Sequence, residues 1–311
     1  MITIHRYEAN QQQYWNKFVA EAKNGHFLFN RQYMEYHADR FQDCSLLFFK
    51  KNKLIALLPA NINKDKLISH GGLTFGGILS NSTMKTSLML EVFDSLITYL
   101  REQNFNTLLY KTIPHIYHTI SAEEDLYAIY CHQGELIHRD VNSVINLSEK
   151  IKFAKGKKEG IKKAIKAGIN VINTNDFSSF FAIGEKILGD KYEAKPTHTA
   201  QEMEILATNF PDNIKLFASY QNDRMLAGII VYESKNVAHT QYMFNSEEGL
   251  SCGALDIILN YLITDIYKDK KYFSFGISTE NKGLYLNEGL IFQKELFSAR
   301  TIVQDVYKIT L

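Results

Sequence analysis

Side chains able to carry protons or charge gather in the last third of the sequence. Histidine has the pKa range of a general base or of a proton relay through water, which makes His239 the first candidate. Glu280 is a second candidate base, and the hydroxyl of Tyr285 can donate a proton. Lys294 can neutralise a phosphate or a developing oxyanion. The structural alternatives are a half-buried histidine, a helix-capping carboxylate, a core aromatic residue and a surface lysine.

Other polar residues have positions suited to binding a substrate. On a predicted strand over residues 236–244 the side chains alternate, so His239 and Gln241 share one face while Tyr242 lies on the other. His198 follows a proline in a predicted loop, and loops often carry binding residues. We predict that His198, Gln241 and Tyr242 contact a substrate.

Residues 281–288 are predicted to form a short helix, followed by a strand over 290–296. Helical spacing would place Asn281 and Tyr285 on one face. Ser278 can cap the N-terminus, where unpaired N–H groups favour an anion. We therefore predict that Ser278 and Asn281 bind substrate.

A lysine-rich segment, residues 150–168, separates the two halves of the chain. Ile161, Ala164 and Ile165 give it one narrow apolar stripe, which predicts a surface helix docked along that stripe. The lysines form either a solvated linker face or a site for phosphates. The eight lysines are Lys150, Lys152, Lys155, Lys157, Lys158, Lys162, Lys163 and Lys166.

Apolar periodicity predicts one order of elements in both halves: a strand hairpin, a third strand, a helix, a strand, a short helix and closing strands. The first half is predicted to place them at residues 44–49, 54–60, 67–79, 84–101, 107–111, 123–131 and 134–147. The second half is predicted to place them at residues 214–220, 225–232, 236–244, 253–267, 272–277, 281–288, 290–296 and 301–309.

The offset between matching elements is about 155 to 170 residues, which indicates a duplicated domain rather than a short repeat. Local spacing agrees, since three residues of one half match three of the other: Tyr130, Gly134 and Arg139 match Tyr285, Gly289 and Lys294. We expect an α+β fold, with domains over residues 1–148 and 149–311, each a mixed, largely antiparallel sheet flanked by helices.

Composition excludes several classes of protein. The 311 residues carry 35 Lys and Arg against 34 Asp and Glu, so the net charge of +1 gives no global attraction to nucleic acid or anionic membranes, and any polyanion must be bound by a local patch. Three scattered cysteines argue against a disulfide framework. The start lacks the pattern of a signal peptide and no apolar run reaches about 18 residues, so we expect a cytoplasmic protein without membrane insertion. No established zinc spacing occurs, and no metal is expected.

The late segment resembles that of the GNAT acyltransferases. In that family a tyrosine four residues before a Gly-aliphatic pair lies near the thioester sulfur, and Tyr285 with Gly289-Leu290 has this spacing. The order of elements in each half is also the family's order. The resemblance therefore covers nearly the whole chain, as a tandem duplication.

Two such units resemble the Fem-type aminoacyl and peptidyl transferases. Their basic segment is matched by Lys162-Lys163-Ala164-Ile165-Lys166-Ala167-Gly168, and their late Lys-x-Gly-Phe-Gly signature by Lys294-Glu295-Leu296-Phe297-Ser298. Both glycines of the signature are replaced. The GNAT pyrophosphate loop should follow Phe244, but its register is wrong and Glu247 and Glu248 would repel a pyrophosphate.

The resemblance implies a transferase that moves an acyl or aminoacyl group to an amine of an envelope-glycan or other phosphate-bearing precursor. The donor is either acetyl-CoA or another acyl-CoA, which the neutral net charge favours, or an aminoacyl-tRNA, whose phosphates Lys158, Lys162 and Lys163 would bind. His239 or Glu280 would serve as base, Tyr285 would protonate the departing thiolate or ribose oxygen, and Lys294 would stabilise the oxyanion.

The second domain is expected to hold the chemistry and the first to shape the acceptor cleft. The rival hypothesis is a non-catalytic binding module that kept the duplicated fold and lost the donor loop.

Overall fold

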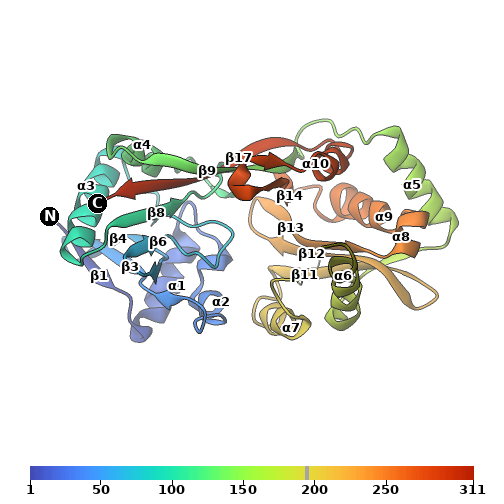
Figure 1. Cartoon of the computed structure of the whole chain (residues 1–311), viewed down its shortest axis with the longest axis horizontal. Coiled ribbons are helices and arrows are strands. Elements are labelled where there is room, and N and C mark those ends of the chain that lie inside the picture. The colour runs from blue at the N-terminus through green and yellow to red at the C-terminus, as the bar shows by residue number, and fades with distance from the viewer. Residues whose placement is uncertain (193–195) are drawn as a thin grey trace. The chain divides into compact units, whose positions relative to one another are not determined.

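The computed structural model describes residues 1–192 and 196–311, which form two compact units (Figure 1). Unit 1 comprises residues 1–141, 279–286 and 303–311, and unit 2 comprises residues 142–278 and 287–302. The expected division after residue 148 runs along the sequence, whereas each of these units gathers separate segments. Within the described residues, no helix has the length and apolar character needed to cross a membrane.

Unit 1 contains two larger sheets with the helices packed on them, and the two-stranded hairpin described below. One sheet is antiparallel, with strands in the order β1 (Ile2–Arg6), β3 (Leu46–Lys50), β4 (Lys53–Leu58) and β7 (Leu79–Ser80). The other has the order β9 (Glu135–Asn146), β17 (Arg300–Thr310), β8 (Thr107–Lys111), β6 (Lys66–Ile68), β5 (Asn61–Asn63) and β2 (Gln42–Asp43). The helices are α1 (Gln12–Glu21), α2 (Arg31–Glu35), α3 (Thr86–Glu102) and α4 (Glu124–Cys131). Buried side chains of α3 and α4 share one apolar core with β3, β4 and β8.

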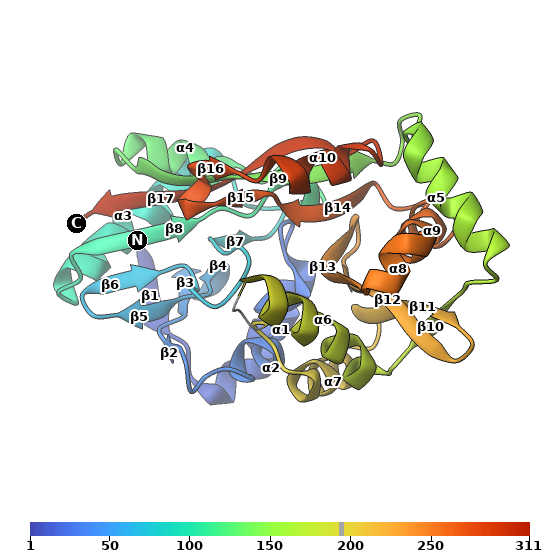
Figure 2. The same cartoon turned by 45° about the vertical axis from the view of Figure 1, so that its right-hand side comes forward.

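Unit 2 is built on one sheet, in the order β10 (Asn170–Thr174), β11 (Ile214–Gln221), β12 (Arg224–Glu233), β13 (Val237–Asn245), β14 (Tyr272–Ile277) and the second half of β9 (Figure 2). Only β13 and β14 are parallel among the described pairs of this sheet. The helices are α5 (Lys155–Lys166), α6 (Phe177–Tyr192), α7 (Ala200–Asn209), α8 (Glu247–Cys252), α9 (Ala254–Tyr261) and α10 (Glu288–Glu295), and α9 continues as a π-helical turn over Leu262–Ile266.

The closing strands of the two halves are exchanged. β9, which follows α4 of the first half, pairs with β14 through Asn146–Tyr272 and Ile145–Phe273. β17, which follows α10 of the second half, pairs with β8 through Val306–Lys111. Each sheet is therefore completed by the last strand of the other half of the sequence, which is why neither unit is a continuous stretch of chain.

The predicted hairpins, α3, α4, α9, β8, β14 and β17 are confirmed within one or two residues at most ends. Residues 67–79, predicted as one strand, instead form β6, a loop and β7. The lysine-rich helix is confirmed as α5, which buries Ile161 and Ala164, whereas Ile165 of the predicted stripe is 63% exposed.

The prediction for the late segment is wrong. Asn281 and Lys282 have left-handed backbone, with φ of 48° and 55°, so no α-helix runs through them and Asn281–Gly283 form only a 3₁₀ turn. The chain instead forms a hairpin, β15 (Thr279–Glu280) and β16 (Tyr285–Leu286), and the helix α10 lies where a strand was expected. Because Tyr130 is inside α4 while Tyr285 precedes α10, the spacing match between the halves is a coincidence.

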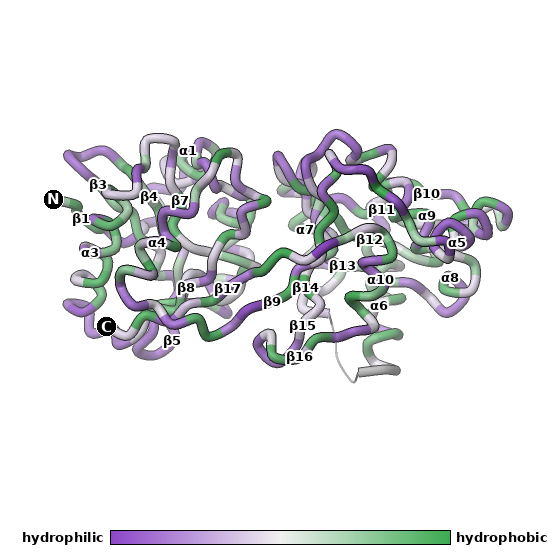
Figure 3. Tube along the Cα trace, turned by 90° about the horizontal axis from the view of Figure 1, so that it is seen from above, coloured by the Kyte–Doolittle hydropathy of each residue, from purple (hydrophilic) through white to green (hydrophobic). Residues whose placement is uncertain are grey.

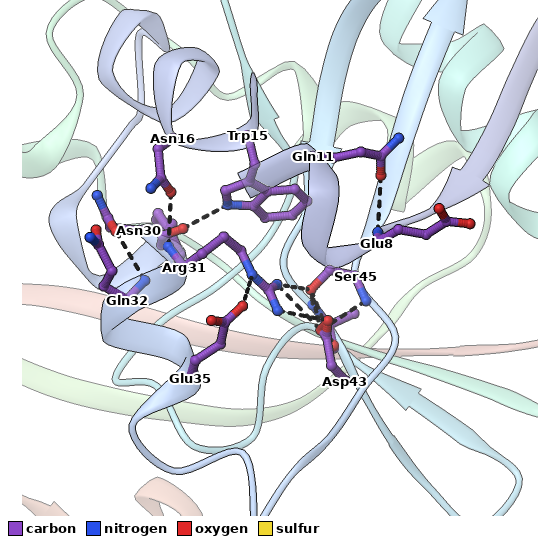
Figure 4. A network of polar contacts seen from close by, with 12 residues as sticks. Glu8, Gln11, Trp15, Asn16, Asn30, Arg31, Gln32, Glu35, Asp43 and Ser45 are labelled. Atoms are coloured by element: carbon purple, nitrogen blue, oxygen red, sulfur yellow. Dashed lines mark hydrogen bonds and ion pairs between the residues drawn. The ribbon is translucent and has the colours of Figure 1, made fainter. Parts of the chain in front are cut away.

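A buried arginine joins α2 to the strands of unit 1 (Figure 4). The Arg31 guanidinium donates to Oδ2 of Asp43 at 2.9 Å, to Oγ of Ser45 at 3.1 Å and to Oε1 of Glu35 at 3.1 Å. Its central carbon lies 3.7 Å from the centroid of the Tyr7 ring. A buried guanidinium is tolerated because its charge is paired and its N–H groups are used, so this network has a structural role.

A buried carboxyl group in α4 contributes a pH-dependent term to the stability of unit 1. The Tyr110 hydroxyl donates to Oδ2 of Asp125 at 2.7 Å and accepts from the Ile78 N–H at 2.6 Å. Burial, opposed by the Tyr110 hydrogen bond, raises the pKa of Asp125 from 3.8 to about 6. Between these two values the folded state binds more protons than the unfolded state, so this term in the free energy of unfolding falls as the pH rises.

We expect the stability of Asp125→Asn relative to the wild type to rise by about 2–3 kcal/mol between pH 4 and pH 7, because the amide is never ionised. Urea unfolding at several pH values measures this difference. The control is Asp212→Asn at an exposed aspartate, for which the difference should stay within about 0.5 kcal/mol. A pH-independent difference for Asp125→Asn would show that this carboxyl group is not the titrating group.

Candidate active site

The site of unit 2 begins where β13 and β14 separate. In the described part of the chain, these parallel strands pair only from Val237–Tyr272 to His239–Ser274. Beyond Ser274, the register of β14 against β9 shifts before Ile277, and Gly276 in this bulge has a φ of 73°. The ends of β13 and β14 therefore leave a gap in the sheet, and ligands of α/β proteins bind at such strand ends.

A cavity of about 440 Å³ lies at this gap. Its walls come from β13 and β14, from the α8–α9 junction, from α5 and from α10. The lining residues are Lys157, Met243, Asn245, Leu250, Gly253, Leu255, Asp256, Leu259, Phe275, Leu290, Gln293, Lys294 and Phe297. The wall is mostly apolar with a few polar groups, which is typical of a small-molecule site.

Lys294 lies on α10, and its side chain binds the backbone at the bulge of β14. Its ammonium group donates to the carbonyl oxygens of Gly276 at 3.1 Å and Ile277 at 2.6 Å, and to Oγ of Ser278 at 2.9 Å. All three N–H groups are thus used, and the side chain is buried on a helix rather than lying on a strand surface. Burial lowers the pKa of Lys294 from 10.5 to about 8. The residue can act on a ligand in the cavity through its charge.

His239 lies on β13 beside the last pair with β14. Nδ1 of its ring lies 3.0 Å from Oγ of Ser274. Burial, and then the charge of Lys294, lower the pKa of His239 from 6.5 to about 4, so the ring is neutral at pH 7. The structure thus brings together two predicted catalytic residues and the predicted binding residue Ser278, which is itself buried against Lys294.

The predicted binding residues His198 and Tyr242 also meet. Nδ1 of His198 lies 2.7 Å from the Tyr242 hydroxyl, which joins the start of α7 to β13. Gln241 is the extra residue of a bulge in β13, because Ile230 pairs with Tyr242 while the next residue of β12 pairs with Thr240. Bulges next to a site redirect side chains, and Gln241 is half-buried here.

Three other predicted residues lie on the hairpin of unit 1. Glu280, Asn281 and Tyr285 are exposed, with 58% of Tyr285 accessible. Within the described residues none of the three lines the cavity of unit 2. Their catalytic and binding roles stay predictions.

The start of α9, where the resemblance to GNAT proteins led us to expect a pyrophosphate, is covered by α5. Gly253, with φ of 79°, joins α8 to α9, and a Cβ on it would lie 2.2 Å from the carbonyl oxygen of Gly160. Asp256 adds a carboxylate to the first turn of α9, where Lys157 pairs with it at 2.9 Å. Backbone and a carboxylate thus already occupy the positive end of α9.

The segment expected to be the pyrophosphate loop forms the short helix α8. Its first turn carries Glu247 and Glu248, and Glu248 pairs with Arg224 at 2.7 Å.

The other side of α5 faces solvent and is strongly basic. Lys158, Lys162 and Lys163 are exposed, as are Lys155 and Lys166. Figure 3 shows this helix as a largely hydrophilic segment. Successive lysines three and four positions apart follow one side of a helix, which suits a row of phosphates.

Sequence reasoning missed Asp256, Gln293 and the special role of Lys157. Lys157 donates to Oδ1 of Asp256 and Oε1 of Gln293, both at 2.9 Å, and its Nζ lies 4.9 Å from the centroid of the Phe297 ring. The acidic first turn of α9, with Asp256, was the available signal. In the described residues no cluster of three or more histidine, cysteine or acidic side chains could hold a metal.

We expect Gly253→Ala to lower the free energy of unfolding by about 2 kcal/mol or more, because the new Cβ would strike the Gly160 carbonyl and the backbone is left-handed. The control is Gly156→Ala in α5, where a Cβ meets nothing within 4 Å. Removal of a helical glycine there should stabilise by about 0.5 kcal/mol. Equal effects of the two changes on denaturant unfolding would contradict the close packing of α5 on α9.

Lys294→Met should cost about 2 kcal/mol of stability, since it leaves two carbonyls and a hydroxyl without their donor. Lys158→Met, at an exposed lysine, should stay within about 0.5 kcal/mol of the wild type. Thermal and urea unfolding measure the stability of both variants. A wild-type melting curve for Lys294→Met would show that the three hydrogen bonds of Lys294 do not stabilise the fold.

Comparison with known proteins supports this architecture. No family model matches the sequence, and no curated protein matches it. The structure is similar to that of FemX, with a TM-score of 0.68 and 10% identity over 99% of this chain and 97% of that chain. It is similar to L-PGS from Bacillus licheniformis, with a TM-score of 0.62 and 11% identity over 97% of this chain and 90% of that chain.

A tandem GNAT protein from the clavulanic acid biosynthesis pathway has a TM-score of 0.51 and 8% identity over 99% of this chain and 98% of that chain. At these identities the likeness concerns the fold. The chain therefore has the Fem-like, tandem GNAT acyltransferase fold that its order of elements predicts.

Proposed function

We propose that this protein is an aminoacyltransferase that takes an aminoacyl group from a tRNA and passes it to an amine of a phosphate-bearing precursor. The observation that carries the proposal is that the two sides of α5 do different things. Its inner side covers the start of α9 with Gly160 and Lys157, and its outer side presents exposed lysines. The first removes the usual pyrophosphate position of an acyl-CoA, and the second offers charge to a polyphosphate chain.

The net charge favoured a thioester donor, but the packing of α5 argues for the tRNA ester. The cavity of about 440 Å³ has room for an aminoacyl group. An envelope-glycan precursor fits as the acceptor on the resemblance to the Fem-type transferases, and FemX shares this fold.

In the proposed reaction the acceptor nitrogen forms a bond to the ester carbon, and the bond from that carbon to the ribose oxygen breaks. The attacking amine loses a proton, which Nε2 of the neutral His239 can accept and pass to water. The charge of Lys294 stabilises the negative oxygen of the tetrahedral intermediate. The ribose oxygen gains a proton, which water can supply.

The test measures tRNA binding at several salt concentrations. Combined charge reversal at Lys158, Lys162 and Lys163 should weaken binding at least tenfold and make the salt slope shallower, since each lost phosphate contact removes about 0.7–0.9 from it. The control reverses exposed lysines elsewhere, Lys17, Lys64 and Lys85, with the same change of net charge. It should retain most of the affinity.

Thermal shifts with acetyl-CoA and with aminoacyl-tRNA complete the test. Stabilisation by acetyl-CoA alone would overturn the proposal. Stabilisation by neither donor would favour the non-catalytic module. Transfer of a radiolabelled amino acid from tRNA to a precursor amine, in the absence of coenzyme A, would establish the activity.

A further inference from the structure

A buried hydrogen-bond chain runs from β9 through β14 to β13. Oγ of Ser274 donates to Oδ1 of Asn142 at 3.1 Å and lies 3.0 Å from Nδ1 of His239. Asn142 is 2% exposed and Ser274 is fully buried. All three residues belong to unit 2. Neither Asn142 nor Ser274 was predicted as a catalytic or binding residue.

The direction of each hydrogen bond in this chain follows from the number of protons available. A serine hydroxyl has one proton and two acceptor lone pairs. The proton goes to Oδ1 of Asn142, because that oxygen can only accept. The N–H of Gly276, 3.3 Å away, occupies one lone pair of Ser274 Oγ. The other lone pair is left for His239, whose Nδ1 must therefore carry the hydrogen.

A neutral imidazole carries one hydrogen, so Nε2 of His239 then bears the free lone pair. No hydrogen bond to Nε2 is found among the described residues. The residue opposite the ring is Gly276, where a Cβ would lie 3.3 Å from Cε1 and 3.9 Å from Nε2. No side chain of residue 276 therefore covers this edge of the ring. The low pKa of His239, about 4, keeps the ring in the neutral form to which this argument applies.

We propose that Asn142 is a positioning residue, which acts through Ser274 to hold His239 as the Nδ1-protonated tautomer with Nε2 as its proton acceptor. The inference rests on the proposed function only for its catalytic meaning, since the tautomer is a property of the protein by itself. Without the acceptor at residue 142, the Ser274 hydroxyl is free to donate to Nδ1. The hydrogen then moves to Nε2, and the acceptor atom is lost.

Two substitutions at Asn142 distinguish the loss of its hydrogen-bond acceptor from a change in packing. Asn142→Leu has a similar volume and cannot accept a hydrogen bond, whereas Asn142→Asp keeps an oxygen at the same place. Asn146→Leu, four residues along the same strand, is the control for a polar-to-apolar change. Ser274→Ala removes the middle of the chain and serves as a second test where Asn142→Leu unfolds.

The measurement is long-range ¹H–¹⁵N NMR of the histidine rings, in which protonated and unprotonated ring nitrogens have distinct ¹⁵N shifts. The His239 signals are assigned by their loss in His239→Gln. We expect unprotonated Nε2 in the wild type, Asn142→Asp and Asn146→Leu. In Asn142→Leu and in Ser274→Ala, at least half of the His239 population should carry the hydrogen on Nε2. In the transfer assay, Asn142→Leu should lower kcat at least tenfold with KM unchanged, and Asn142→Asp should restore it.

A wild-type ring protonated on Nε2, or an unchanged tautomer in both Asn142→Leu and Ser274→Ala, would overturn this inference. Because the NMR result needs no substrate, the expected tautomers together with absent tRNA binding would sink the proposed function and leave the positioning role intact. The expected tRNA binding, together with a His239 ring protonated on Nε2, would leave the proposed function intact and overturn the positioning role of Asn142.

Discussion

The separation of β13 from β14 after three residue pairs is the constraint on which the site of unit 2 depends. Parallel strands that stayed paired would satisfy each other's backbone groups and leave no gap between them. Once they part, the carbonyl oxygens of Gly276 and Ile277 need new donors, because buried backbone groups are costly without partners. Lys294 supplies those donors. A positive charge is thereby held at the cavity wall as a consequence of keeping the sheet open.

The separation of β13 from β14 also explains why polar side chains lie next to one another across the sheet. His239 and Ser274 form the last pair of β13 with β14, so their side chains lie where backbone pairing stops. Ser278, beyond the bulge, bonds Lys294 and lies 3.4 Å from Ser143 of β9. The small hydroxyl side chains fill the narrow space between strands, and each links a charged or titratable residue to β9. The same hydrogen bonds therefore satisfy the polar groups of the opened sheet and position the reactive side chains.

Local periodicity was enough to predict the strand hairpins and the amphipathic helices α3, α5 and α9, because such elements depend on neighbouring residues. The prediction for residues 279–296 was wrong, and the reason is also local. Asparagine tolerates a left-handed backbone, but the residue type of Lys282 does not predict a second left-handed conformation directly after Asn281. The N-cap of α10 at Asn287, whose Oδ1 accepts from the Leu290 N–H, was also overlooked.

The candidate site was predictable in part. His239 and Lys294 could be chosen by residue type and by the family resemblance, but their partners could not. Ser274 and Asn142 are 132 residues apart in the sequence, and only the pairing of β9 with β14 brings them together. The cover that Gly160 places over Gly253 likewise depends on tertiary packing of α5 and has no local signal.

The exchange of β9 and β17 affects the order in which the chain can fold. Thr112 donates to the carbonyl oxygen of Asp305, 193 residues later, beside the β8–β17 pairing. Until β17 has been synthesised, β8 has an open edge on that side, and long-range pairing of this kind forms slowly. During synthesis the first half therefore cannot reach its final structure on its own. A nascent chain would expose the edge of β8 during this interval, a period in which chaperones or rapid synthesis would protect it from aggregation.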